Sequence, residues 1–171
     1  MVPDPRRLFK RMTVTANLEL GASLRHGHSL DEAYERVFEL FPRVKERLGQ
    51  KAGTLSGGEQ QMVAMGRALM ARPKVLLMDE PFAALDALTR RKMQEELLQL
   101  WQDIKFTVLF VTHSIEEAVY VSDRIVLLSP RPGRIRSITK VPFGRPRELD
   151  LESEPEFQDI ARELRHQLDE N

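Results

Sequence analysis

Apolar residues recur at helical spacing through the first third of the chain. The spacing predicts a helix over residues 13–20 and a longer helix over 29–48. Ser29 and Glu32 form the pattern of a capping box at the start of the longer helix, and Pro42 predicts a break in it. The face of this helix that we expect in the core consists of Ala33, Val37, Leu40, Phe41 and Val44.

A loop rich in Gly and Ser, residues 49–58, leads into a further predicted helix over 59–71. From residue 74 onward, apolar and β-branched runs alternate with amphipathic segments. The predicted strands are 74–79 and 106–112, both expected to be buried, together with 124–128 and 134–141. The predicted helices are 86–105, a short one capped by Ser114 with Glu117, and 154–167.

The order of strand, helix, strand, helix and strand from residue 74 predicts a parallel α/β sheet. Ligand sites in such sheets lie at the carboxyl ends of the strands. Asp79 and Glu80 follow the first of these strands, and His113 follows the second. These residues are therefore candidates for a functional site.

The composition narrows the class of protein. Of the 171 residues, 26 are Lys or Arg and 26 are Asp or Glu, so the formal net charge is zero, which argues against a general binder of nucleic acid. The 42% hydrophobic and 30% charged residues are typical of a globular chain. The absence of Cys excludes disulfides and thiolate metal sites. Apolar runs are only a few residues long, so we expect a cytoplasmic protein that reaches a membrane through a partner.

The two adjacent carboxylates suit metal and water chemistry. Carboxylate oxygens are ligands for Mg²⁺, which takes one or two of them and completes its shell with waters and phosphates. In nucleotide hydrolases the first acid of such a pair holds Mg²⁺, and the second can activate the attacking water. Alternatively, Asp79 and Glu80 only cap the next turn. His113 could donate a hydrogen bond to a phosphate oxygen, although a lone His is more often a structural or surface residue.

Residues 55–60, Leu-Ser-Gly-Gly-Glu-Gln, carry a more specific signal. Two consecutive glycines let the backbone approach a ligand closely, and Ser56 adds a hydroxyl. The following helix directs unpaired N–H groups and its positive dipole end at the loop, which makes an anion site suited to a terminal phosphate. A given six-residue string occurs by chance in such a chain with a probability on the order of 10⁻⁶, so a helix entry without function is a weak alternative.

This loop resembles the signature motif of ATP-binding-cassette (ABC) ATPases. Residues 75–79 resemble the Walker B strand of that family, and Glu80 stands where the family has its catalytic glutamate. Residues 84–86 resemble the D-loop, and residues 111–113 resemble the H-loop. Order and spacing agree over nearly the whole chain, to about Pro146, so the chain is identified as a member of this family.

The resemblance implies a partial P-loop NTPase fold of the α/β class, with a parallel-sheet core and a helical subdomain. It implies ATP and Mg²⁺ as cofactors, and a head-to-tail dimer in which each ATP lies between the Walker motifs of one subunit and the signature loop of the other. Asp79 would then help to hold Mg²⁺ through water, Glu80 would polarise the attacking water, and His113 would contact the γ-phosphate. The implied cofactor-binding residues are Ser56, Gly57 and Gly58, which would touch the γ-phosphate held by the opposite subunit, Glu59, and Asp86, which would link the two sites.

The sequence departs from the family in the phosphate-binding loop. The Walker A motif, G-x-x-x-x-G-K-[ST], should precede the signature, yet the chain contains no Gly-Lys pair, nor a counterpart of the aromatic residue that stacks on adenine. The resemblance begins at the Q-loop, where Asp4 stands in place of the family's Gln or Glu. We therefore expect a truncated subunit that covers the later two-thirds of one domain and is inactive alone.

Two branches of the family are resembled. Residues 9–81 resemble ATPases of branched-chain amino-acid importers, and residues 82–133 are similar to those of nitrate, sulfonate and taurine importers. One hypothesis is a recombinant gene joined near residues 79–81. Single long reads of the source DNA across codons 75–90 test it, because two separate genes without a joined read contradict it.

The predicted organisation has three segments. Residues 1–72 hold the Q-loop remnant, the helical subdomain and the signature helix; 73–141 hold the α/β core; 142–171 form a C-terminal loop and helix. The predicted function is the ATP-hydrolysing subunit of an importer of a small solute, an amino acid or a nitrate, sulfonate or taurine type of compound, bound to membrane permease subunits. The alternatives are a non-catalytic subunit that supplies only the signature half-site to a partner ATPase, and a helical interaction module that binds no nucleotide.

Overall fold

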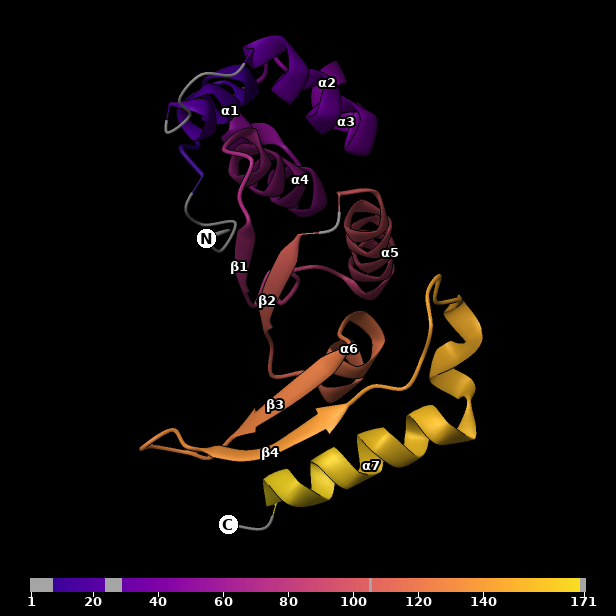
Figure 1. Ribbon diagram of the computed structural model, residues 1–171. Coiled ribbons are helices and arrows are strands. Elements are labelled where there is room, and N and C mark those ends of the chain that lie inside the picture. Colours follow the sequence, from indigo (N-terminus) through magenta and orange to yellow (C-terminus); the bar gives the residue numbers. More distant parts are fainter. Residues whose placement is uncertain (1–7, 24–28, 105, 170–171) are drawn as a thin grey trace. The chain divides into compact units, whose positions relative to one another are not determined.

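The computed structural model describes residues 8–23, 29–104 and 106–169, and the chain forms two compact units that divide between Val111 and Thr112 (Figure 1). The first unit contains α1 (Val14–Ala22), α2 (Leu30–Leu40), α3 (Pro42–Glu46), the 3₁₀ helix η2 (Ala52–Thr54), α4 (Gly57–Met70), β1 (Val75–Asp79), α5 (Ala87–Ile104) and β2 (Thr107–Val111). The second contains α6 (Ile115–Val121), β3 (Arg124–Leu128), β4 (Ile135–Lys140), the 3₁₀ helix η3 (Leu149–Ser153) and α7 (Pro155–Asp169).

The helix predicted over residues 29–48 is divided at Phe41, which confirms the break that Pro42 predicted. Phe41 leaves helical geometry, with φ −128° and ψ 72°. Pro42 is then the first residue of α3. An N–H group in the first turn of a helix makes no intrahelical hydrogen bond, so the N–H that proline lacks is not needed there. The interruption follows from the proline ring alone, so the sequence was sufficient to place it.

The capping box predicted at the start of α2 is wrong. Ser29 caps the helix, but its hydroxyl accepts from the N–H of Asp31. The carboxylate of Glu32 accepts from Nη2 of Arg72, at 2.5 Å. The start of α2 is therefore linked to a residue 40 positions further along the chain.

Helices α1 and α4 pack at very close range, and two glycines permit it. A Cβ atom at Gly21 would lie 1.9 Å from the carbonyl oxygen of Arg67, so the two backbones nearly touch. A Cβ at Gly66 would lie 3.0 Å from Val37 and 3.1 Å from Leu18. The core between α1, α2, α3 and α4 includes Val14, Leu18, Ala33, Val37, Phe41, Val44, Val63 and Met65.

Strands β1 and β2 are parallel and joined through α5, as the alternation of elements predicted. The register runs from Val75 opposite Thr107 to Asp79 opposite Val111. Leu76 and Met78 of β1 are buried in one cluster with residues of α5, namely Met93, Leu97 and Leu100. Val75 and Leu109 are each 57% exposed, so the prediction of two buried strands is wrong: one face packs on α5 and the other carries exposed apolar side chains.

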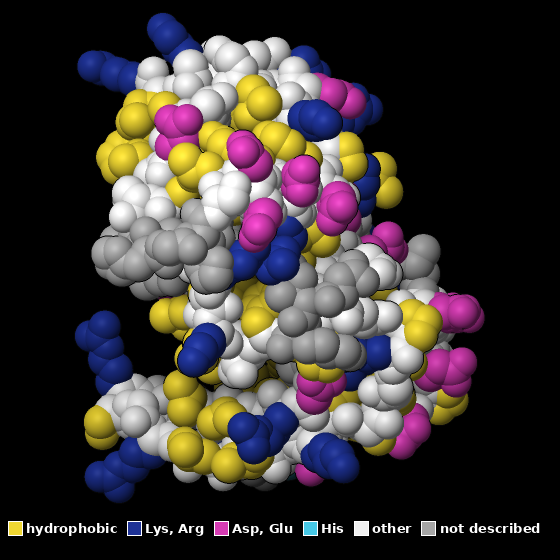
Figure 2. Space-filling view, turned by 45° about the horizontal axis from the view of Figure 1, so that its top comes forward, with side chains coloured by type: hydrophobic (Ala, Val, Ile, Leu, Met, Phe, Trp, Pro, Cys, Tyr) yellow, Lys and Arg dark blue, Asp and Glu magenta, His cyan; other side chains and the backbone are white. Residues whose placement is uncertain are grey.

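The second unit is built around an antiparallel pair, not a third parallel strand. β3 pairs with β4, from Arg124 opposite Lys140 onward, because a short turn returns the chain directly beside β3. The prediction that residues 124–128 extend the parallel sheet is therefore wrong. In the same unit α7 packs with α6. The rings of Phe143 and Phe157 stack, with 6.0 Å between their centroids. The exposed apolar residues of the pair are Val126, Leu128, Ile135 and Ile138. On the face in Figure 2, exposed hydrophobic side chains (yellow) lie among Lys and Arg side chains (dark blue).

Candidate functional site

The loop of residues 55–60 is held in shape by its own hydrogen bonds. The Ser56 hydroxyl accepts from the N–H of Glu59 (3.3 Å), and the Glu59 carboxylate accepts from the N–H of Ser56 (2.9 Å). This is a capping box, and α4 therefore begins at Gly57. The predicted start, residue 59, was two residues too late. Nε2 of Gln60 donates to the carbonyl of Leu55 (2.8 Å), which fixes the other side of the turn. The S-x-x-E pattern was present in the sequence and would have located this helix start.

Two backbone donors of this first helical turn stay open. Among the residues that the structure describes, the N–H groups of Gly57 and Gly58 have no hydrogen-bond partner. They lie at the start of a 14-residue helix, where the dipole favours negative charge. The geometry suits an anion, and the contact of this loop with a phosphate stays a prediction.

Residues of the candidate D-loop and the start of α5 lie against this turn. A Cβ at Gly57 would be 3.4 Å from Leu85, and a Cβ at Gly58 would be 2.7 Å from the methyl group of Thr89. Gly58 therefore has a packing role, because a side chain there would force the methyl group of Thr89 to shift. Neither contact could be read from a local pattern, since they join positions about 30 residues apart.

Asp86 caps α5 in this structure. Its Oδ1 accepts from the N–H of Thr89 (3.0 Å), as an N-cap residue does. This hydrogen bond from Thr89 lowers the pKa of the Asp86 carboxyl below its usual range. The local role explains an Asp at this position, and a link across a dimer interface stays a prediction.

Asp79 and Glu80 lie at the carboxyl end of β1, where the sequence placed them. Both are exposed, and the N–H of Glu80 donates to the carbonyl of Val111 (2.8 Å), which ties this corner to the end of β2. Glu80 has a φ of 44°, in the left-handed region that non-glycine residues rarely occupy. Such a conformation costs about 1 kcal/mol or more and persists only where the surroundings enforce it. Strain at this corner is consistent with a functional role for Glu80.

The remaining predicted residues are placed differently. His113 belongs to the second unit, where it is exposed in the turn that Thr112 Oγ1 closes by accepting from the N–H of Ser114 (3.1 Å). His113 and the other candidate residues belong to different units, and the contact of His113 with a phosphate stays a prediction. Asp4, the candidate Q-loop residue, lies outside the described residues.

The end of β1 offers carboxylate oxygens, the ligands that Mg²⁺ prefers. Within the described part of the chain, no group of three or more His, Asp or Glu side chains gathers as metal ligands. Asp79 offers one exposed carboxylate at a strand end, with Glu80 next to it. One or two carboxylates suffice for Mg²⁺ when phosphates and waters complete its shell. These residues fit a metal ion that arrives with a nucleotide.

Glu59 makes the capping box sensitive to pH. The hydrogen bond from the Ser56 N–H is the main cause that lowers the pKa of Glu59, and Arg47, whose Nε lies 3.4 Å away, adds to it. A lowered pKa in the folded state means that this stabilisation is present above the pKa of the unfolded chain, near 4.3, and is lost as the pH falls through the folded value. We expect Glu59→Gln to cost about 0.5–1 kcal/mol at pH 7 and less at pH 3, because Gln keeps only a neutral hydrogen bond.

Urea unfolding followed by the fluorescence of Trp101, the single Trp of the chain, measures this difference at each pH. Glu39→Gln is the matched control, since Glu39 is exposed on α2 and lies outside the loop. A difference between Glu59→Gln and the parent chain that stays constant from pH 7 to pH 3 would contradict the assignment.

The known proteins that the chain resembles in sequence include ATP-binding proteins of transporters. Residues 1–83 match a protein family described as "ABC transporter". The chain is 41% identical over 163 residues to the aliphatic sulfonates import ATP-binding protein SsuB of Bacillus cereus, an alignment that covers 95% of the chain and 63% of that protein. It is 48% identical over 108 residues to the bicarbonate transport ATP-binding protein CmpD of Synechocystis, covering 63% of the chain and 38% of that protein.

The fold has counterparts among solved structures. A bacterial ABC transporter cassette, solved as a dimer, superposes with a TM-score of 0.66 at 31% identity, covering 84% of the chain and 62% of the cassette. The α/β arrangement of parallel strands and helices is thus the P-loop NTPase fold of such cassettes, which confirms the predicted fold class. The chain spans less than two thirds of the length of each of these relatives.

The similarity to a sulfonate importer subunit extends over 95% of the chain. The predicted resemblance to this branch covered only residues 82–133. The resemblance of residues 9–81 to branched-chain amino-acid importers stays a prediction. No helix in the described ranges is both long and apolar enough to span a lipid bilayer.

Proposed function

Since the chain belongs to the ABC transporter family of ATP-binding proteins, we propose that it is part of the ATP-hydrolysing subunit of an importer. One observation carries the proposal: the signature loop presents the open N–H groups of Gly57 and Gly58 beside Leu85 of the D-loop. In the family, these are the elements that meet an ATP held by the opposite subunit of a head-to-tail dimer. A preformed loop supports such a role, because it needs little reorganisation when the phosphate arrives.

The residues take the following parts in this proposal. Ser56, Gly57 and Gly58 contact the γ-phosphate of the ATP held by the opposite subunit, and Glu59 holds the loop in shape. Asp79 would hold Mg²⁺ at the chain's own site through water, and the bound ion would neutralise charge on the phosphates. Glu80 orients and polarises the attacking water, and His113 contacts the γ-phosphate. Asp86 links the two sites across the dimer.

The relatives support a proposed cargo and proposed partners. A small oxyanion of the sulfonate or nitrate type is the proposed cargo, supported by the alignment with a sulfonate importer over most of the chain; an amino acid is the alternative. The proposed partners are a second ATPase subunit and integral-membrane permease subunits, with the helical region of residues 13–48 against the permease at the cytoplasmic face of the membrane. The division into residues 1–72, 73–141 and 142–171 stays a prediction.

A second candidate function is supported by the signature loop, which its own hydrogen bonds hold in shape. In this function the chain is a non-catalytic subunit that lends its signature loop to a partner with a Walker A motif. Only one complete composite site would then exist in the dimer.

The 171-residue chain alone is expected to hydrolyse ATP at background. The phosphate cradle supplies most of the binding and positioning in phosphoryl transfer, and the chain has no motif for it. Phosphate release measured with Mg²⁺ and ATP tests this. Turnover above background that Glu80→Gln abolishes would contradict the prediction.

A mixing experiment tests the signature half-site, which both candidates lend to an opposite subunit. The partner is the full-length sulfonate importer subunit with its own signature serine replaced by Arg, which keeps its Walker A motif but lacks a working signature loop. If the chain lends a half-site, adding it raises turnover by about 100-fold, the scale on which aligned donors act on a developing charge. Ser56→Arg should remove the gain, and Ser153→Arg, an exposed residue of η3, should not. A mixture that stays at background contradicts the role of Ser56, Gly57 and Gly58 in both candidates.

A further inference from the structure

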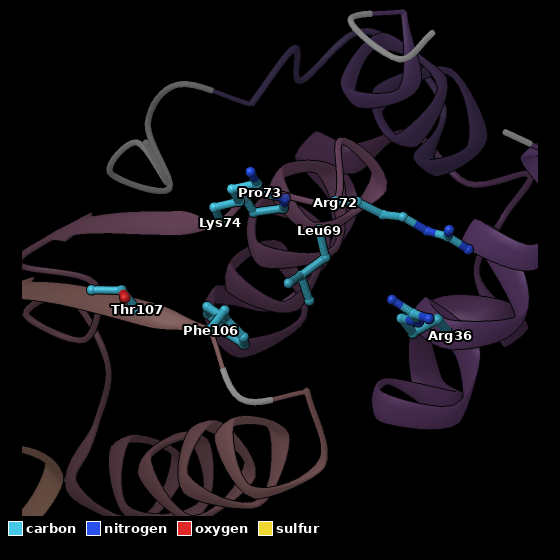
Figure 3. A pocket seen from close by; sticks show the side chains of 7 residues that line it. All are labelled: Arg36, Leu69, Arg72, Pro73, Lys74, Phe106 and Thr107. Atoms are coloured by element: carbon cyan, nitrogen blue, oxygen red, sulfur yellow. The ribbon is translucent and has the colours of Figure 1, made fainter. Parts of the chain in front are cut away.

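The first unit has a pocket that none of the residues proposed to act on ATP lines. Its volume is about 320 Å³, within the range of small-molecule sites. It opens between α2, the end of α4 and the start of β1 and β2, and Figure 3 shows the side chains that line it. They are Arg36, Leu69, Arg72, Pro73, Lys74, Phe106 and Thr107.

Positive charge dominates the polar part of this pocket. Three cations line it, Arg36, Arg72 and Lys74, and in Figure 3 the side chain of Arg72 extends toward α2, where Arg36 lies. Glu32 offsets one charge, through its 2.5 Å contact with Arg72. Arg36 and Lys74 have no ion-pair partner within the described ranges, so the pocket keeps a surplus of about two positive charges.

Arg72 occupies a backbone position that favours glycine. It follows the last turn of α4 with a φ of 48°, and its N–H donates to the carbonyl of Leu69 (2.9 Å). Helices commonly end in this way with Gly, because a side chain in the left-handed region is strained. The Nε atom of Arg72 is also buried, without a hydrogen-bond partner in the part of the chain that the structure describes. A strained arginine with an unused donor on a pocket wall is consistent with a ligand-binding role.

The other wall of the pocket is apolar. Leu69 and Phe106 are buried, with exposed fractions of 6% and 8%, and Pro73 lies next to them in the lining. The N–H of Thr107 donates to the carbonyl of Lys74 (3.2 Å), which ties the start of β2 to the segment before β1 and keeps the wall in place. Arginine planes and a phenylalanine ring together suit a flat aromatic body, and the guanidinium forks suit a carboxylate.

We propose that this pocket binds a small aromatic carboxylate. The ring lies against Leu69 and Phe106, and the carboxylate faces Arg36, Arg72 and Lys74. The pocket and the candidate nucleotide residues lie at opposite ends of two elements. Lys74 precedes β1 and Asp79 ends it, and the signature loop is at the other end of the 14-residue helix α4, about 20 Å from the pocket.

The ligand therefore binds without nucleotide and does not compete with it. For this reason the present proposal can fail while the proposed ATPase function stands.

Three probes separate the parts of the recognition. Benzoate carries the ring and the charge, benzamide keeps the ring and shape without the charge, and acetate keeps the charge without the ring. With nine heavy atoms, and an efficiency per atom only slightly above that of drug-sized ligands, benzoate should bind with a Kd on the order of 1 mM. We expect benzoate to shift the methyl resonances of Leu69 and Thr107 in NMR titrations of the 171-residue chain, and benzamide and acetate to bind at least ten-fold more weakly.

Arg36→Gln and Lys74→Gln test the cations, since both residues are exposed and their replacement leaves the core intact. Each should weaken benzoate binding several-fold, whereas Arg43→Gln, an exposed arginine of α3 outside the pocket, should leave the Kd unchanged. Equal binding of benzamide would overturn the role of the charge, and equal binding of acetate would overturn the role of the ring. Saturation by benzoate without shifts at Leu69 and Thr107 would overturn the site.

Discussion

Replacing Gly21 with Ala is expected to lower the free energy of unfolding of the first unit by about 2–3 kcal/mol. The new methyl group would lie 1.9 Å from the carbonyl oxygen of Arg67, which is backbone and cannot rotate away. Helix α1 must therefore move off α4 by more than an ångström, and overpacking of this kind costs about 3 kcal/mol or more. The better helix propensity of Ala recovers only about 1 kcal/mol of this.

Urea unfolding followed by Trp101 fluorescence reports on the first unit, where the indole N–H of Trp101 donates to the carbonyl of Phe106 (2.9 Å). The midpoint should fall while the slope stays constant. Gly49→Ala is the matched control, because no atom lies within 4 Å of a Cβ at that position. An unchanged midpoint for Gly21→Ala would show that the α1–α4 contact is looser than the structure has it.

Replacing Arg147 with Met is expected to destabilise the second unit by about 2–4 kcal/mol. The buried guanidinium donates to the carbonyls of Val119 (3.3 Å) and Tyr120 (2.6 Å), in the last turn of α6. It also donates to Phe143 (3.2 Å) and Gly144 (3.4 Å), in the loop that leads to α7. Helix ends leave such carbonyls without intrahelical donors, and an unsatisfied buried acceptor costs about 1–3 kcal/mol.

Burial of this cation has a cost of its own, which the substitution would relieve. Desolvation, with a smaller contribution from the Arg145 cation, lowers the pKa of Arg147 to about 10, although the Asp123 carboxylate opposes the shift. Met matches the length of the apolar stem and carries no charge to desolvate. We expect the loss to dominate, because four backbone acceptors stay in place after their common donor is removed.

The measurement for Arg147→Met is hydrogen exchange at the amides of α6, which should lose protection. The Trp101 unfolding transition serves as an internal reference, because all partners of Arg147 lie in the second unit. Arg162→Met is the control, since Arg162 is exposed on α7 and its guanidinium pairs with Asp159, three residues away. Full protection of α6 in the Arg147→Met chain would show that water replaces the guanidinium at little cost.

Two of the capping patterns show how much of the local hydrogen bonding the sequence alone predicts. The same S-x-x-E pattern occurs at residues 29–32 and 56–59. It forms a reciprocal box at Ser56, where Glu59 has the nearby Arg47 as an additional partner. At Ser29 the hydroxyl accepts from the N–H of Asp31, and the carboxylate of Glu32 accepts from Nη2 of Arg72. The pattern is the same in both places, so these four residues alone do not decide which hydrogen bonds form.

The candidate site divides in the same way. The positions of Asp79 and Glu80 at the end of a parallel strand followed from the apolar run before them, and the start of α4 was readable from Ser56 and Glu59. The packing of Gly58 against Thr89 was not readable, although a Cβ at position 58 would lie 2.7 Å from the methyl group of Thr89. Neither was the left-handed backbone of Glu80, at the corner where its N–H donates to the end of β2.

By itself, the sequence determined the motifs, the helical and strand segments, the break at Pro42 and the α/β class. These depend on side-chain periodicity, ring geometry and hydrogen bonds between residues a few positions apart. Only the tertiary structure decided that β3 pairs with β4, that β1 and β2 keep one apolar face exposed, and that Arg147 caps α6. Those outcomes depend on which of several distant partners meets a strand edge or a helix end, and the free energies that separate the choices come from contacts absent from any local window of the chain.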